Sequence, residues 1–211
     1  MRTLEELINK NDTALKLINE WANASESQYE ILPASDQSGK VLYSLQISTR
    51  STMGAVAYET GGILIEHGWL RILGSGHPKL TRNLIDWNEN RTSGYLLIAD
   101  DAVGGFFAIN SGGFGEDIGN IYYWAPDSLL WEPLDIGYSD FLNWAFSENL
   151  ANFYSDLRWP SWVLDIKTIS ADQCFNFVPF LWTKEGSIES SSRRAVSIFE
   201  QFSLNKDFES S

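Results

Sequence analysis

The chain has 211 residues, of which 44% are hydrophobic and 14% aromatic, enough to bury a substantial core. Its formal net charge of −13 disfavours binding to nucleic-acid phosphates or to anionic lipid. The single cysteine excludes an intramolecular disulfide, and no apolar stretch reaches the ~20 residues that a membrane-spanning helix needs. We expect one cytoplasmic domain over residues 1–211, with a core of about 1–157 and a C-terminal extension over 158–211.

The first ninety residues predict short helices followed by strands. Thr3 and Glu6 have the spacing of a capping box, and a second amphipathic helix is predicted from Ala14, Leu17, Ile18 and Trp21. β-branched and aromatic residues predict strands at 41–47 and 54–58, and the apolar run 63–73 predicts further strand structure. After a Gly- and Pro-containing loop, helical spacing is shown by Leu80, Leu84 and Trp87.

The middle of the chain predicts a four-stranded meander. Residues 95–99 are apolar on both faces, as in a central strand, and an acidic, glycine-containing turn at 100–105 leads to a partner strand at 106–109. A mobile acidic loop then precedes strand 121–124, and after a turn residues 129–134 are expected to form the strand that runs back beside it. Ser139 is the expected N-cap of a helix that continues to Leu157. The remainder predicts an irregular extension with at most two strands and a polar tail after Leu204.

The charge is concentrated in one segment, since residues 92–157 contain ten Asp or Glu and no Lys, Arg or His. We therefore expect an acidic functional face that attracts a cationic partner. Catalytic patterns are missing from the sequence. His67 and His77 are the only imidazoles, Ser75 does not fit a nucleophile elbow, and neither a phosphate-binding loop nor a spaced metal-ligand motif occurs. We expect no cofactor and no metal.

Two acidic pairs, Asp100 with Asp101 and Glu116 with Asp117, admit a second interpretation. If they converge, they form a hard-cation site or a glycosidase-like cleft; solvated turn acids are the favoured interpretation. Arg71 is either a ligand anchor or a structural salt-bridge partner, and the latter is favoured. Most of the nine Trp residues are expected to pack in the core.

Segments 68–76, 104–110 and 123–132 resemble an uncharacterised bacterial domain family. The order of the predicted elements, together with residues 138–142, resembles the SUKH superfamily of bacterial immunity-type proteins. The resemblance implies an α+β fold, with a mainly antiparallel central sheet covered by N-terminal and C-terminal helices. It also implies a cleft on one sheet face that binds and neutralises a toxin partner without catalytic residues.

These observations together predict a non-catalytic protein-binding domain, in which an acidic cleft meets a basic partner such as a nuclease-like toxin. Acids would steer the encounter and aromatic side chains would anchor it. The alternatives are a small-substrate or carbohydrate hydrolase with paired carboxylates, and a cytosolic scaffold. The predicted partner-binding residues are Trp69, Arg71, Asp100, Asp101, Glu116, Asp117, Tyr123, Trp124, Trp131 and Glu132.

Overall fold

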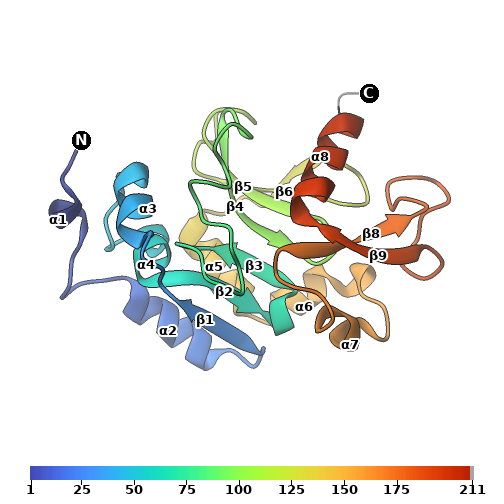
Figure 1. Cartoon of the computed structure of the whole chain (residues 1–211), viewed down its shortest axis with the longest axis horizontal. Helices are drawn as coiled ribbons and strands as arrows, with labels where there is room; N and C mark the ends of the chain where they lie inside the picture. Colours follow the sequence, from blue (N-terminus) through green and yellow to red (C-terminus); the bar gives the residue numbers. More distant parts are fainter. Residues whose placement is uncertain (210–211) are drawn as a thin grey trace.

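A seven-stranded antiparallel sheet forms the centre of the molecule in the computed structural model, which describes residues 1–209 (Figure 1). Its strands are hydrogen-bonded in the order of the sequence, from β1 to β7. Each strand pairs antiparallel with the one before it. The strands are β1 (Tyr29–Pro33), β2 (Thr60–Ile65), β3 (Leu70–Leu73), β4 (Tyr95–Asp101), β5 (Phe106–Asn110), β6 (Ile121–Trp124) and β7 (Trp131–Pro133).

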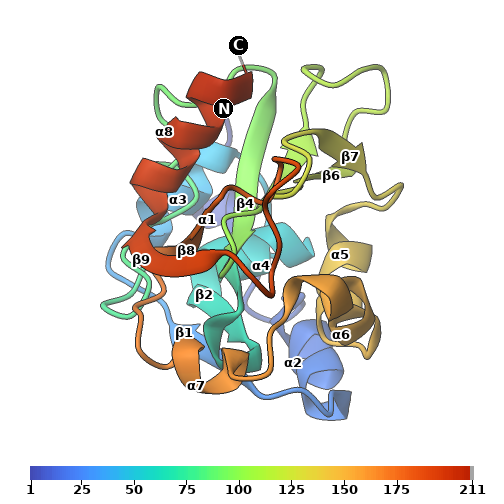
Figure 2. The ribbon, with the colours of Figure 1, turned by 90° about the vertical axis from the view of Figure 1, so that its right-hand side faces the viewer.

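Two layers cover the two faces of this sheet. One layer consists mainly of helices that precede or follow the strands: α2 (Leu15–Ala24), α4 (Thr52–Glu59), α5 (Tyr138–Ala145) and α6 (Asn149–Phe153). The other layer is C-terminal and contains α7 (Trp162–Ile166), β8 (Gln173–Val178), β9 (Ser192–Ser197) and α8 (Ile198–Glu209). Figure 2 shows α8 and the β8–β9 hairpin on one side of β4, and α5 and α6 on the other.

Adjacent residues of β5 show that successive side chains of one strand pack against opposite layers. Phe106 packs edge-to-face on Phe202 of α8 at a ring-centroid distance of 5.2 Å, whereas Phe107 packs on Phe141 of α5 at 5.1 Å. Since successive side chains of a strand point to opposite faces, a strand between two layers is apolar throughout. One continuous hydrophobic core extends from Ile18 to Phe202.

The prediction of an α+β fold is confirmed, and so is the meander from β4 to β7. Helix α1 (Leu4–Leu7) begins at the predicted capping box of Thr3 and Glu6. The helix predicted from Ala14 to Trp21 is α2. The apolar run 63–73 forms a hairpin, in which β2 and β3 are joined by a 3₁₀ turn (Glu66–Gly68).

The strands predicted at 41–47 and 54–58 are wrong, because these segments form α3 (Ser38–Leu45) and α4. Ser51 caps α4 by accepting a hydrogen bond from the Gly54 amide at 3.1 Å. Gly54 is required there, since a Cβ would lie 2.1 Å from the Ser48 carbonyl oxygen. A short apolar run does not distinguish a buried helix from a strand, and here a cap residue upstream was the better signal.

Other boundaries differ from the prediction as well. Leu80, Leu84 and Trp87 are buried as a helical face would be, yet Leu80 forms an isolated β-bridge with His77, and Leu84 and Trp87 lie in turns. The helix expected from Ser139 is divided into α5, α6 and a 3₁₀ turn (Ser155–Leu157), and its N-cap is Gly137, because the Ser139 hydroxyl bonds that of Thr52. Strand β1 was not predicted. The expected polar tail is largely helix α8, and its residues 210–211 lie outside the described residues.

Candidate functional site

The ten predicted partner-binding residues fall into two groups in the structure. Glu116, Asp117, Trp131 and Glu132 lie at the outer edge of the sheet, on the loop before β6 and on β7, and are exposed or half-buried. The other six are at most 3% exposed, and a partner cannot touch them in this conformation: Trp69, Arg71, Asp100, Asp101, Tyr123 and Trp124. The structure therefore separates the predicted site into a buried polar network and an exposed acidic edge.

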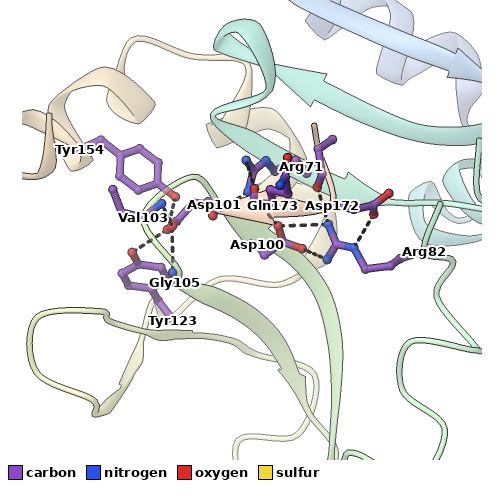
Figure 3. Close-up of polar contacts among 11 residues, drawn as sticks. Arg71, Arg82, Asp100, Asp101, Val103, Gly105, Tyr123, Tyr154, Asp172 and Gln173 are labelled. Atoms are coloured by element: carbon purple, nitrogen blue, oxygen red, sulfur yellow. Dashed lines mark hydrogen bonds and ion pairs between the residues drawn. The ribbon is translucent and has the colours of Figure 1, made fainter. Parts of the chain in front are cut away.

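The two buried carboxylates are neighbours on β4 and point to opposite faces of the sheet, as the alternation of a strand requires. Figure 3 shows Asp100 turned toward Arg71 and Arg82, and Asp101 turned toward Tyr123 and Tyr154. The prediction that both are solvated turn acids is wrong, because the strand continues through them and each side chain is 0% exposed.

Asp100 is the centre of a buried ion-pair network. Its carboxylate accepts from Nη1 of Arg71 at 3.3 Å and from both terminal nitrogens of Arg82. Arg82 continues to Asp172, whose Oδ1 accepts from Nε at 2.9 Å. Two arginines thus face two carboxylates, and the network is electrically balanced, as buried charges need to be. The preference for Arg71 as a structural salt-bridge partner is confirmed.

This network joins the sheet to the C-terminal layer. Arg71 on β3 donates from Nη2 to the carbonyl oxygen of Gln173 at 2.7 Å, and Arg82 donates to that of Ala171 at 2.8 Å. Burial would lower the pKa of Arg82, but the adjacent Asp100 and Asp172 carboxylates raise it above its usual value. Burial likewise opposes ionisation of Asp172, while the Thr81 amide and Arg82 together lower the pKa of this carboxyl. Both groups therefore stay charged at neutral pH.

Asp101 makes four hydrogen bonds on the opposite face. Its Oδ2 accepts from the hydroxyls of Tyr123 and Tyr154 at 2.7 and 3.0 Å, and its Oδ1 accepts from the amides of Val103 and Gly105 at 3.0 and 2.8 Å. Burial raises the pKa of Asp101, and the four donors act against that rise. Gly105 permits this approach, because a Cβ there would lie 2.4 Å from the carboxylate. The carboxylate thereby fixes the β4–β5 turn to α6.

We expect Asp101→Ala to lower the free energy of unfolding by about 3 kcal/mol or more, because it leaves four buried donors without an acceptor. The phenol ring of Tyr123 remains in Tyr123→Phe, so that variant should lose only about 1–2 kcal/mol. Urea unfolding of both single variants and of the double variant gives the coupling energy between the two side chains. Additive losses would show that the 2.7 Å hydrogen bond contributes nothing to stability.

We use the term acidic edge for the loops on either side of β6, the outermost strand β7, the segment that joins β7 to α5, and the first turn of α5. Its exposed carboxylates are Glu116, Asp127, Glu132, Asp135 and Asp140. Within residues 1–209, none of these five carboxylates forms an ion pair with a basic side chain. Figure 2 places β6, β7 and α5 along one side of the molecule. Five of the ten acids of residues 92–157 thus lie exposed in elements on this side, and Asp100 and Asp101 do not contribute to it.

Apolar side chains accompany the acids on this edge. Ile118 is 71% exposed and Leu130 is 64% exposed. Trp131 is half-buried and stacks on Trp124, with ring centroids 5.2 Å apart. Asp117 differs from its acidic neighbours, because it holds its own loop by accepting from Asn110 at 2.8 Å and from Tyr122 at 2.9 Å. Hydrogen bonds from Tyr122 and Asn110 outweigh partial burial and lower the pKa of Asp117.

The two acidic pairs do not converge. Asp100 and Asp101 are enclosed, whereas Glu116 and Asp117 lie on the loop before β6. In the described part of the chain, no group of three or more His, Cys, Asp or Glu side chains is arranged to hold a metal ion. None of the helices over residues 1–209 has the length and apolar character needed to cross a membrane. Cys174 is buried and unpaired, and burial raises the pKa of its thiol.

Three members of the buried network were not anticipated from the sequence: Arg82, Tyr154 and Asp172. Arg82 and Asp172 are 90 residues apart and belong to irregular segments, where no periodicity marks a residue as buried. A buried carboxylate requires a cation, and few Lys or Arg residues lie near Asp100 in the sequence. This small number of possible partners was the one signal in the sequence that pointed to Arg82.

Fold and site together define an α+β protein in which an antiparallel meander is joined by a buried Arg–Asp network to its own C-terminal layer. The chain belongs to the family described as "Protein of unknown function DUF2625", which it matches over residues 4–201. The match thus includes most of the C-terminal layer.

Two bacterial proteins are similar to the chain over almost their whole length. The "Putative uncharacterized protein YbfG" of Escherichia coli strain K12 is 43% identical over 208 residues, which cover 97% of this chain and 95% of that protein. An "Uncharacterized protein" of Haemophilus influenzae strain Rd is 39% identical over 214 residues, which cover 97% of this chain and 94% of that protein. The expectation of an uncharacterised bacterial family is thereby confirmed.

Proposed function

We propose that the chain is a non-catalytic protein-binding domain whose acidic edge docks a basic protein. The observation that carries this proposal is the combination at that edge of five exposed carboxylates, which form no ion pair among residues 1–209, with the exposed apolar side chains of Ile118 and Leu130. Charge alone would serve solubility, whereas apolar groups surrounded by charge suit a surface that is covered in a complex.

The location of the paired carboxylates supports binding over hydrolysis. A general acid or nucleophile must reach its substrate, but Asp100 and Asp101 are enclosed and occupied by internal partners. The other pair, Glu116 and Asp117, lies on the loop before β6, where Asp117 accepts hydrogen bonds from Asn110 and Tyr122. The hydrolase alternative therefore has less support than the binding proposal.

The resemblance to SUKH immunity-type proteins supplies the finer part of the proposal, which is that the partner is a basic, nuclease-like toxin domain. Such a domain binds nucleic-acid phosphates through Lys and Arg, and the acidic edge is complementary to that surface. In this proposal the contact is made at the sheet edge rather than in a cleft on a sheet face. Complementary charge would accelerate association by roughly 10 to 10³ at low salt.

The test compares two variants in which the same number of negative charges is removed. The edge variant carries Glu116→Gln, Asp127→Asn, Glu132→Gln, Asp135→Asn and Asp140→Asn, while Asp117 is kept because it holds its loop. The control variant carries Gln at five exposed positions that form no ion pair among residues 1–209: Glu20, Glu26, Glu89, Glu185 and Glu189.

Affinity capture with the unaltered chain first identifies the partner, and stopped-flow association with that partner then gives the rate constants. We expect the edge variant to associate about tenfold more slowly at low salt, and the control variant to stay within about twofold of the unaltered chain. The difference should shrink as salt rises, since the Debye length is about 8 Å at physiological ionic strength. Equal slowing of both variants would reduce the effect to net charge and refute docking at the edge.

A further inference from the structure

A cavity of about 250 Å³ lies over the opposite end of the sheet, at β2 and β3, beneath α7 and the segment that follows it. Apolar side chains form its walls: Leu64, Ile166 and Ile169. Its charged or titratable lining consists of Arg71, Lys79 and His67, and no Asp or Glu of the described chain lines it. In a protein with a net charge of −13, a cavity whose lining includes basic side chains and no acidic one is suited to an anion.

The strand register explains why the apolar Leu64 and the charged Arg71 both line this cavity. Leu64 pairs with Arg71 across β2 and β3, and Arg71 pairs with Asp100 across β3 and β4, so these side chains share the sheet face that bears the C-terminal layer. Asp100 and the carbonyl oxygens of Asp101 and Gln173 accept from the terminal nitrogens of Arg71. Its Nε–H has no acceptor within residues 1–209, but the Arg71 side chain is 0% exposed, so a ligand in the cavity does not reach this donor directly.

The cavity entrance carries positive charge that can reorganise. Lys79 pairs with Glu30 at 2.5 Å, but its side chain is 57% exposed, so Nζ can turn toward a ligand at little cost. Partial burial, and to a smaller extent the nearby Lys167, lowers the pKa of His67. An anion entering there would meet Lys79 and His67 and would compete with Glu30 for Lys79.

We propose that this cavity binds a small organic carboxylate with a short apolar chain. The apolar chain of the ligand packs on Leu64, Ile166 and Ile169, and its carboxylate pairs with Lys79 at the entrance, near His67. The volume fits a ligand of about eight non-hydrogen atoms, since it equals the liquid volume of about eight waters at about 30 Å³ each. This site is separate from the acidic edge and does not rest on the proposed docking function.

Three six-carbon probes with different head groups test the proposal on the full-length chain: hexanoate, 1-hexanol and hexylammonium. Each is titrated while amide resonances are followed by NMR. We expect hexanoate to shift the amides of Leu64, Gly68 and Ile169 saturably and to bind about tenfold more tightly than 1-hexanol. Hexanoate should also raise the pKa of His67, because a nearby anion stabilises the imidazolium. Equal affinity for the alcohol, tighter binding of the amine or shifts confined to other parts of the chain would each overturn the proposal.

Two lysines in matched surroundings provide the variant and its control. Lys79→Glu reverses the charge at the cavity entrance, while Lys40→Glu reverses a lysine that is equally exposed and also paired, with Asp86 at 3.2 Å. We expect Lys79→Glu to weaken hexanoate binding about tenfold, and Lys40→Glu to leave it within about twofold. Ile169→Trp fills the cavity and should abolish binding, with thermal melts confirming the fold of each variant. Equal weakening by both lysine variants would show that hexanoate responds only to net charge.

Discussion

Asp100→Asn is expected to lower the free energy of unfolding by about 3–5 kcal/mol, which is a large share of the stability of an ordinary domain. The substitution keeps the size of the side chain and removes its charge. Arg71 and Arg82 are both at most 4% exposed, and the remaining carboxylate of the network, Asp172, is 21% exposed and pairs with Arg82. The loss arises less from a missing attraction than from a guanidinium left desolvated without its partner.

Urea unfolding at pH 7, followed by Trp fluorescence, measures this loss, and Asp140→Asn is its control. Asp140 is also an Asp in a regular element of the same acidic segment, but it is exposed in the first turn of α5 and forms no ion pair among the described residues. We expect Asp140→Asn to stay within about 0.5 kcal/mol of the unaltered chain. If the two variants unfold at the same urea concentration, Arg71 and Arg82 must be hydrated in solution, and the ion-pair network is not what joins the two layers.

The parts of the fold that could be predicted from sequence are those in which local pattern and tertiary environment agree. Residues 95–99 are apolar on both faces because β4 is covered on both sides, and the glycines at 104–105 mark the turn that follows. The capping box of α1 depends only on Thr3 and Glu6, three residues apart. Such features need no knowledge of distant segments.

The errors occurred where distant segments determine the outcome. Residues 41–47 and 54–58 were assigned to strands because their apolar residues suit a sheet, although both segments cover the sheet as helices. Asp100 and Asp101 were assigned to a turn because carboxylates followed by glycines suit turn geometry. Their burial depends on Arg82 and Asp172 for one carboxylate and on Tyr123 and Tyr154 for the other, and these partners lie up to 72 residues away.

The acidic edge was the part of the candidate site most accessible to sequence analysis. Ten acids without a base in residues 92–157 require negative charge on whichever surface this segment forms, regardless of its fold. The count of charged residues does not predict which aromatic side chains are exposed on that surface. Trp124 and Trp131 pair across β6 and β7, but Trp124 is covered by α8 and only Trp131 remains half-exposed at the edge.

The largest effect is expected from removing the C-terminal layer, which the sequence suggested to be an extension of a core over 1–157. A chain ending at Leu157 loses the ring contacts of Trp69 with Trp159 and Trp162, and those of Phe106 and Trp124 with Phe202. Burial of each large apolar side chain contributes roughly 1.5–3 kcal/mol, so this loss alone approaches the whole stability of a typical domain.

The same truncation also exposes the ion-pair network, because Arg71 loses the Gln173 carbonyl and Arg82 loses both Asp172 and the Ala171 carbonyl. We expect residues 1–157 to show no cooperative thermal transition and no dispersed amide spectrum. A chain ending at Asp207, which lacks the partly exposed Phe208 and Glu209, should melt within a few degrees of the full chain and serves as the control. A cooperative melt of residues 1–157 would show that the sheet and its helical layer fold alone. The C-terminal layer would then be a separate cover, and the Arg–Asp network would be dispensable for the fold.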